Sequence, residues 1–254
     1  MKRFFIILLS VLGPVLAGAA VFLSGGGDPV TAACLGDIPA PVGYEREDAP
    51  EGSYTEFLRS QRLLPHGAKV HLYSGKVAPF QWISSGVIDR KLISEYEQCA
   101  DVVIRIRSEY FWKTQQLDSL RFTDVNGVEH AYDGGSFRWK FKSYLEQVYK
   151  TCNTESVYRE TSPRAIRDVQ PGDILVYRSR RKGRLGHAVL VADVARNPDG
   201  KVAILCVQGN TPAREMHIVR NLNSFRNPWF FPDVDGDIIH LSVCSFKKDE
   251  LRHY

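Results

Sequence analysis

Three side chains have the types and the order that thiol catalysis requires. Cys99 lies in an apolar, helix-like segment, His187 opens an apolar run after a glycine, and Gln208 ends the next apolar run. In such chemistry a thiolate attacks, a histidine takes the thiol proton, and a third polar group orients the imidazole. The sequence therefore predicts Cys99 as nucleophile, His187 as general base, and Gln208 or Asn210 as the orienting group.

Two further side chains are candidates for support of this site. Gln98 precedes the cysteine and could contribute to an oxyanion hole. Asp193 lies six residues after His187, so strand alternation places it on the same face. It serves the site or belongs to a separate polar network. Cys99 also has structural interpretations, as a small buried hydrophobe or as the disulfide partner of Cys206.

The elements that must position these residues are helices followed by strands. Ser53 with Glu56 predicts a capped helix up to Arg59, and Ser94 with Glu97 predicts a cap for a helix from about Leu92 to Trp112. A start at Ser94 would put Cys99 beyond the first turn. Further predicted elements are a hairpin around Asn126-Gly127, a helix over 137–152, and strands over 174–177, 187–195, 202–208, 215–220 and 237–245. This order predicts an α+β fold with helices packed on an antiparallel sheet.

The N-terminus has the pattern of an export signal. Lys2-Arg3 precedes an apolar run that ends at Leu23, and Ala17-Gly18-Ala19 fits a cleavage site. An uncleaved membrane anchor is the alternative. We expect a signal or anchor over 1–23, a flexible linker over 24–37, a single domain over 38–246 and a tail over 247–254. The protein is then extracytoplasmic, periplasmic or secreted, and touches the membrane only through its N-terminal segment.

The net charge and the sequence spacing of cysteine and histidine residues indicate which classes of partner and cofactor are not expected. The net charge of +4 is too small to indicate a nucleic-acid partner. The five cysteines form no Cys-x-x-Cys pair, and no His-Glu-x-x-His occurs, so neither a metal site nor another cofactor is predicted. Arg178 to Arg184 form a basic loop before His187. This loop is a solvated hairpin tip or a contact for an anionic envelope polymer such as peptidoglycan.

Several separated motifs, taken in order, resemble the DUF4846 family of exported bacterial proteins of unknown function. The resemblance covers roughly 40–246. The chain departs from the family in a longer, more basic loop before Gly186 and in Gly209-Asn210-Thr211, where bulkier residues are usual. The motifs are Gln98-Cys99-Ala100-Asp101, Arg105 to Tyr110, Phe141 to Leu145, Pro171-Gly172-Asp173, Gly186 to Val191 with Asp193 to Ala195, and Gln208 with Pro212 to His217.

A more distant resemblance implies an activity. The order of helix cysteine, Pro-Gly-Asp strand, Gly-His strand and polar residue is similar to NlpC/P60 and CHAP cysteine peptidases and amidases. That resemblance implies a papain-like fold and the cutting of peptidoglycan peptides, with Cys99, His187 and Gln208 in the catalytic positions. The usual Asp-Cys-Ser context is here Gln98-Cys99-Ala100. We therefore expect a thiol hydrolase acting on an amide bond, or alternatively a non-catalytic envelope module of the same fold that binds cell wall or a protein partner.

Overall fold

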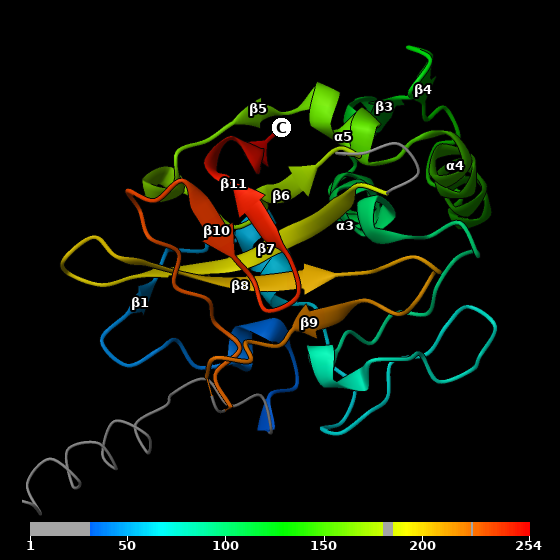
Figure 1. Ribbon diagram of the computed structural model, residues 1–254. Coiled ribbons are helices and arrows are strands. Elements are labelled where there is room, and N and C mark those ends of the chain that lie inside the picture. Colours follow the sequence, from blue (N-terminus) through cyan, green and yellow to red (C-terminus); the bar gives the residue numbers. More distant parts are fainter. Residues whose placement is uncertain (1–30, 180–184, 225) are drawn as a thin grey trace, which may run out of the picture.

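One antiparallel sheet forms the centre of the molecule. The computed structural model describes residues 31–179, 185–224 and 226–254. Its main sheet has the strand order β2-β9-β8-β7-β6-β12-β5, and β1 also pairs with β7 (Figure 1). Every strand pair in it is antiparallel, as predicted. The strands of this sheet are β1 (Glu45–Arg46), β2 (Ser84–Val87), β5 (Ser162–Pro163), β6 (Ile174–Tyr177), β7 (His187–Arg196), β8 (Val202–Gln208), β9 (His217–Val219) and β12 (Leu251–His253).

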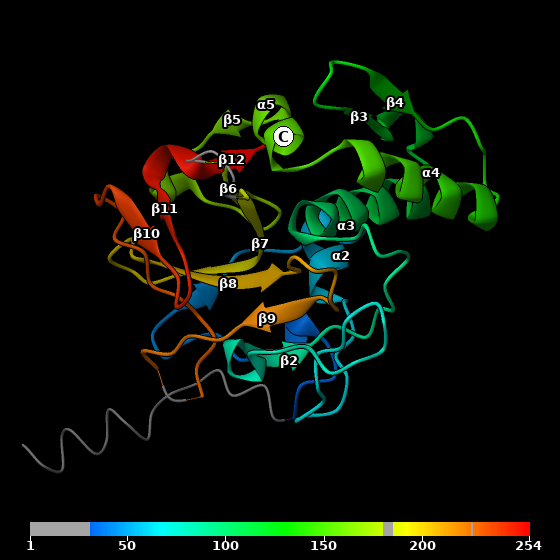
Figure 2. The ribbon, with the colours of Figure 1, turned by 45° about the vertical axis from the view of Figure 1, so that its right-hand side comes forward.

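The two faces of the sheet are covered by different kinds of structure. Helices α2 (Tyr54–Arg59) and α3 (Cys99–Lys113) lie on one face, and the hairpin β10 (Ile238–His240)–β11 (Ser245–Lys247) lies on the other (Figure 2). Leu190 and Val207 pack in the core beneath the helices. Val189 and Val191 pack in the core on the hairpin side. Because strand side chains alternate between faces, each apolar strand contributes to both cores.

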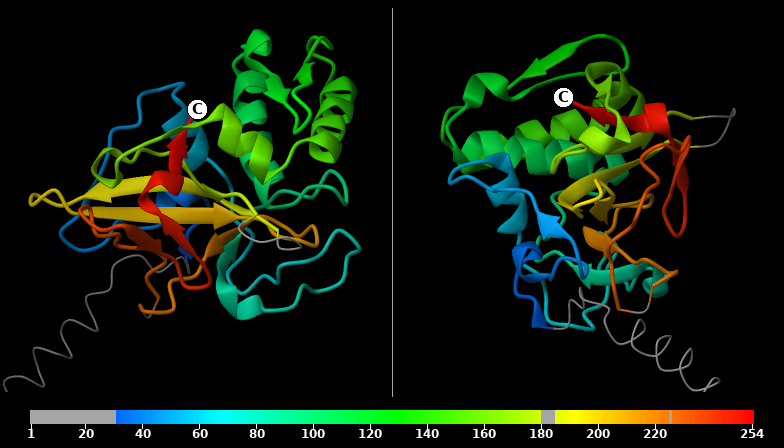
Figure 3. Two further views of the ribbon diagram at one scale, coloured as in Figure 1. Left: turned by 45° about the horizontal axis from the view of Figure 1, so that its top comes forward. Right: turned by 90° about the vertical axis from the view of Figure 1, so that its left-hand side faces the viewer.

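The remaining helices form a layer beyond α3. Helix α4 (Arg138–Thr151), helix α5 (Thr154–Glu160) and the hairpin β3 (Arg121–Thr123)–β4 (Glu129–Ala131) gather on this side (Figure 3). Single 3-10 turns cover Leu35–Asp37, Gln81–Ile83, Leu117–Ser119, Ile166–Asp168 and Lys248–Glu250. The predicted hairpin at Asn126-Gly127 is confirmed, whereas α5 was not predicted.

The start of α3 corrects the sequence prediction. The helix begins at Cys99 rather than near Leu92, because Ser94 and Glu97 do not cap it. The Glu97 carboxylate instead accepts from the Ile93 amide at 2.7 Å and pairs with Arg105 at 2.6 Å. The N-terminus of α3 is instead capped by the carboxylate of Asp101, which accepts a hydrogen bond from the Gln98 amide at 2.8 Å. Cys99 is therefore the first residue of the helix and not a residue of its second turn.

Two segments expected to be peripheral contribute to the folded core. Leu251 in the predicted 247–254 tail pairs with Leu175 of β6 and is 1% exposed. Leu35 in the predicted 24–37 linker is also 1% exposed and begins a 3-10 turn. The expected tail is thus a strand inside the sheet, and the ordered domain extends on both sides of 38–246. Residues 1–23 lie outside the described residues, and no helix in the described ranges is long and apolar enough to cross a membrane.

Candidate functional site

The N-terminus of α3 meets the sheet at the end of β8. Strand β8 ends at Gln208, and Gly209 then passes directly under the helix. A Cβ at Gly209 would lie 2.7 Å from Cγ2 of Val102 and 3.0 Å from the Gln98 carbonyl oxygen. Only a residue without a side chain allows this approach. The glycine therefore lets the first turn of the helix reach the beginning of strand β7.

Cys99 is placed beside the residue that follows His187. Its side chain is buried, at 7% exposure. Burial raises the pKa of the Cys99 thiol, while hydrogen bonding by the backbone amide of Ala188 and by the amides at the start of α3 acts in the opposite direction. Such amides stabilise negative charge on sulfur. The thiol is thus protonated in the resting protein, next to groups that would favour its thiolate.

His187 and Gln208 meet on the other face of the same strands. Nε2 of His187 donates to Oε1 of Gln208 at 2.9 Å. The adjacent register pair of β7 and β8 is Leu190 with Val207. Burial lowers the pKa of His187 below its usual value, and the hydrogen bond that His187 donates to Gln208 offsets part of this effect. The imidazole is therefore neutral near pH 7 and available as a base.

His217 determines which way the Gln208 amide points and which nitrogen of His187 carries the proton. Its Nδ1 lies 3.0 Å from the Glu215 carbonyl oxygen, which can only accept, so Nδ1 carries the proton. The bare Nε2 of His217 then accepts from Nε2 of Gln208 at 3.1 Å, which turns Oε1 of Gln208 towards His187. His187 consequently carries its proton on Nε2 and leaves Nδ1 unprotonated. Burial lowers the pKa of His217 to about 4, which keeps this arrangement in place at neutral pH.

The Cys99 thiol opens into a cavity between α3, α4 and the start of β7. The cavity has a volume of about 550 Å³, and its lining includes Gln98, Cys99, Cys152, Gly186 and Thr211. A Cβ at Gly186 would lie 2.5 Å from the Tyr177 carbonyl oxygen, so the residue before His187 is restricted to glycine. Among the described residues, no hydrogen bond joins the Cys99 thiol to the His187 ring. His187 does not line this cavity, and its ring contacts Phe246 on the face that carries the β10–β11 hairpin, so the imidazole must turn around the start of β7 to reach the thiol.

The supporting candidates separate in the structure. Gln98 lines the cavity, and its Oε1 accepts from Oγ1 of Thr211 at 2.6 Å, which leaves its amide NH2 as a donor. Asn210 does not reach the histidine, because its Oδ1 accepts from the neighbouring Thr211 amide at 2.8 Å. Of the two proposed orienting groups, the structure thus brings only Gln208 to His187.

Asp193 lies outside the site, contrary to the face predicted by simple alternation. A register shift between Val191 and Asp193 interrupts the β7–β8 pairing and reverses which face the aspartate occupies. Its fully buried carboxylate pairs with Arg46 at 2.7 Å and Arg59 at 2.8 Å. Asp193 therefore holds α2 and the β1 region onto the sheet.

The disulfide interpretation of Cys99 is also wrong. Cys99 and Cys206 are both free thiols. Cys206 lies in the core on the hairpin side of the sheet, whereas α3 lies on the opposite face. The other thiol that lines the Cys99 cavity is Cys152, at the end of α4. Burial raises the pKa of Cys152 to about 12.

Two polar residues at the site were missed from sequence. His217 was interpreted as a surface or hydrogen-bonded residue, yet it is 0% exposed. Its two-residue spacing from Val219 in an apolar strand was the available signal for an inward position. Asp101, three residues after Gln98, was the available signal for a helix start at Cys99. Of the predicted basic loop, residues 180–184 lie outside the described residues, and Arg178 pairs with Glu155 at 3.4 Å.

Metal ligands are not clustered at this site. Within the described ranges, no group of three or more His, Cys, Asp or Glu side chains could hold a metal ion. The polar groups at the sheet edge instead form one linear chain of hydrogen bonds from Glu215 to His187. An arrangement of this kind can orient an imidazole and move a proton at its free nitrogen.

The fold and site define a class of mixed α+β protein with a cysteine at a helix start and a histidine–glutamine pair on the adjoining strands. The family model described as a domain of unknown function (4846) matches residues 36–139 and 133–253. Because these matches span most of the chain, the protein belongs to this family. No curated protein and no solved structure matches the chain.

Proposed function

We propose that this protein is a thiol hydrolase of papain-like type that cleaves an amide bond. The observation that carries the proposal is the hydrogen-bond chain from the Glu215 carbonyl through His217 and Gln208 to His187. This chain leaves Nδ1 of His187 unprotonated at the start of β7, where the Cys99 thiol lies on the other face beside the backbone amide of the next residue, Ala188. A buried network that specifies one tautomer of a histidine at the start of a strand has little use in a purely structural strand.

The chemistry follows from these positions. Once the His187 ring has turned around the start of β7 towards α3, its Nδ1 takes the proton of the Cys99 thiol, and the thiolate attacks the amide carbonyl carbon in the cavity. The backbone amide of Cys99 and the amide NH2 of Gln98 can donate to the oxyanion. The imidazolium then gives its proton to the leaving amine as the C–N bond breaks. Water, deprotonated by the same imidazole, hydrolyses the thioester and regenerates the thiol.

The expected setting of this reaction is the cell envelope. The export signal or anchor over 1–23 supports an extracytoplasmic location, and peptidoglycan peptides are amide substrates found there. The mixed polar and apolar lining of the cavity, which includes Tyr96, Thr154 and Thr211, suits a peptide backbone that needs both donors and acceptors.

A second candidate is a binding module without catalysis. The observation that favours it is the burial of Cys99, which raises the thiol pKa and so reduces the fraction of nucleophilic thiolate. In that function the same cavity would hold a cell-wall peptide or a segment of a partner protein without cleaving it.

Incubation of the mature protein with purified muropeptides, followed by mass spectrometry of the products, tests the proposal. We expect cleavage of one amide bond by the wild type and by Cys152→Ser, and a loss of at least about a thousandfold in Cys99→Ser. Cys152→Ser is the matched control because it removes the other thiol of the same cavity. Cleavage that persists in folded Cys99→Ser would refute the proposal, and binding without cleavage by the wild type would favour the second candidate.

A further inference from the structure

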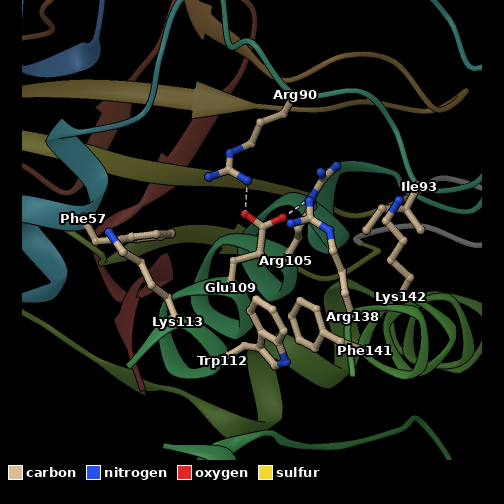
Figure 4. Close-up of a pocket in the computed structure, with 10 residues that line it drawn as sticks. All are labelled: Phe57, Arg90, Ile93, Arg105, Glu109, Trp112, Lys113, Arg138, Phe141 and Lys142. Carbon is tan, nitrogen blue, oxygen red and sulfur yellow. Dashed lines mark hydrogen bonds and ion pairs between the residues drawn. The ribbon is translucent and has the colours of Figure 1, made fainter. Parts of the chain in front are cut away.

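A second pocket lies towards the C-terminal end of α3 and shares no lining residue with the Cys99 cavity at the start of that helix. It has a volume of about 230 Å³ and is bounded by α2, the segment before α3, the last two turns of α3 and the first turn of α4 (Figure 4). Its lining contains five cations, Arg90, Arg105, Lys113, Arg138 and Lys142, but one carboxylate, Glu109. This imbalance is the feature that requires a physical reason.

The two arginines at the base of the pocket are already neutralised. Glu109 pairs with Arg90 and, at 2.8 Å, with Nε of Arg105. Glu97 pairs with Arg105 from behind at 2.6 Å. Two carboxylates thus balance two guanidinium groups. This buried network gives the pocket a rigid base whose hydrogen-bond donors are held in fixed directions.

The other three cations of the pocket form no ion pair with a carboxylate of the described residues. Lys113 comes from the last turn of α3, and Arg138 and Lys142 come from the first turns of α4. Within the described part of the chain, none of the three forms an ion pair, and Lys113 contacts only the face of Phe57, at 5.6 Å. Three positively charged side chains from two helices therefore line one concavity, with Lys113 beside Phe57 and Lys142 beside Ile93 (Figure 4).

The start of α4 adds to this excess. A helix N-terminus carries partial positive charge and is normally accompanied by acidic residues in its first turn. Helix α4 has none there and begins with Arg138. A cation in this position is unfavourable for the isolated helix. An anion bound between Arg138, Lys142 and the free backbone amides of the first turn would remove that conflict.

An aromatic wall completes the pocket. The rings of Trp112 and Phe141 stack with their centroids 5.2 Å apart and an interplanar angle of 17°. Both rings line the pocket beside the cations. This combination fits a ligand with a charged head and an adjoining apolar or planar part.

We propose that this pocket binds a phosphate group, carried as a monoester on an organic molecule. A carboxylate would balance one of the three uncompensated charges, whereas a phosphate monoester brings nearly two negative charges and three acceptor oxygens. Guanidinium groups suit phosphate geometry, and the Trp112–Phe141 wall receives the esterified group. A soluble phosphate ester and a lipid with a phosphate-monoester headgroup share this chemistry.

Titration of the full mature chain with phenyl phosphate, followed by calorimetry and by thermal unfolding, tests the assignment. Sodium benzoate and sodium chloride at equal ionic strength are the controls for charge alone. We expect saturable binding and a raised Tm with phenyl phosphate only. The double variant Arg138→Gln/Lys142→Gln should weaken binding about tenfold or more, because two charge-assisted contacts are lost.

The control variant Lys76→Gln/Lys201→Gln removes the same charge at exposed positions outside the pocket and should bind as the wild type does. Vesicles of phosphatidylcholine with and without phosphatidic acid distinguish the two sources. Binding to phosphatidic acid vesicles indicates a lipid, and binding to phenyl phosphate alone indicates a soluble ester. No saturable binding of either, or equal weakening in the control variant, would overturn the proposal. Loss of hydrolase activity in Cys99→Ser has no bearing on this result.

Discussion

At the scale of single residues, the central feature is a chain of hydrogen bonds in which the donor and acceptor of every bond are determined by the Glu215 carbonyl at its start. The Glu215 carbonyl fixes the proton of His217, His217 fixes the amide of Gln208, and Gln208 fixes the proton of His187. Each step follows because an acceptor cannot face an acceptor in a buried place. In the proposed reaction His217 is therefore a positioning residue, since it contacts His187 only through Gln208.

The titration of His217 gives a prediction for stability. Its pKa is about 4 in the folded protein against 6.5 for a free histidine, so the unfolded chain takes up the proton more readily. The stabilisation is complete above pH 6.5 and is lost as the pH falls towards 4, by about 3 kcal/mol in total. His217→Gln keeps one donor and one acceptor but cannot titrate. We expect the variant to lose about 3 kcal/mol less stability than the wild type between pH 7 and pH 4.

Urea unfolding at a series of pH values measures this difference. His66→Gln, at an exposed position in a turn, is the matched control and should follow the wild type. Identical pH dependence of the wild type and His217→Gln would contradict the tautomer assignment, because it would mean that His217 does not resist protonation.

At the scale of elements, the site depends on how closely α3 approaches the end of β8. Gly209→Ala would put a Cβ 2.7 Å from Val102 and 3.0 Å from the Gln98 carbonyl oxygen. We expect a loss of about 1–3 kcal/mol in the free energy of unfolding, and a larger relative loss of hydrolysis because the start of α3 must move. Gly86→Ala is the comparison, since its Cβ would meet only the end of the Ile218 side chain, at 3.3 Å. Equal activity in folded Gly209→Ala and wild type would argue against this coupling.

Local sequence signals predicted most of these elements. The Ser53 cap was confirmed, as its hydroxyl accepts from the Glu56 amide at 3.2 Å. The strands over 174–177 and 202–208 have the predicted bounds. The predicted start of α3 was wrong. Glu97 fits a capping box in sequence, but its carboxylate forms an ion pair with Arg105 inside the helix. Asp193 was misplaced because a bulge cannot be seen in an alternating pattern.

The candidate site could be predicted only in part, for a related reason. His187 and Gln208 lie on strands joined by one turn, so the hairpin brings them together from local pattern alone. The tautomer chain needs His217 on a third strand, and its register depends on pairing that the sequence does not display. The C-terminal strand β12 was missed likewise, because its partners β5 and β6 lie about 80 residues earlier in the chain.

At the scale of the whole molecule, α3 separates two places with different chemistry. Its first residue, Cys99, belongs to a cavity whose lining mixes polar, apolar and charged side chains of both signs. Its last turns line a strongly cationic pocket closed by α4 (Figure 4). If both proposals hold, the protein would cut an amide at one end of the helix while a phosphate-bearing molecule occupies the other. Variants at one place should then leave ligand binding at the other unchanged.

The most direct test of the thiol mechanism is the reaction of the protein with p-nitrophenyl acetate. A nucleophilic Cys99 should release one equivalent of nitrophenol in a burst and leave an acetyl thioester that intact-protein mass spectrometry detects. We predict that the adduct maps to Cys99, persists in Cys152→Ser, disappears in Cys99→Ser, and forms about a hundredfold more slowly in His187→Ala. An adduct formed at the same rate in folded His187→Ala, or on a residue other than Cys99, would contradict the account.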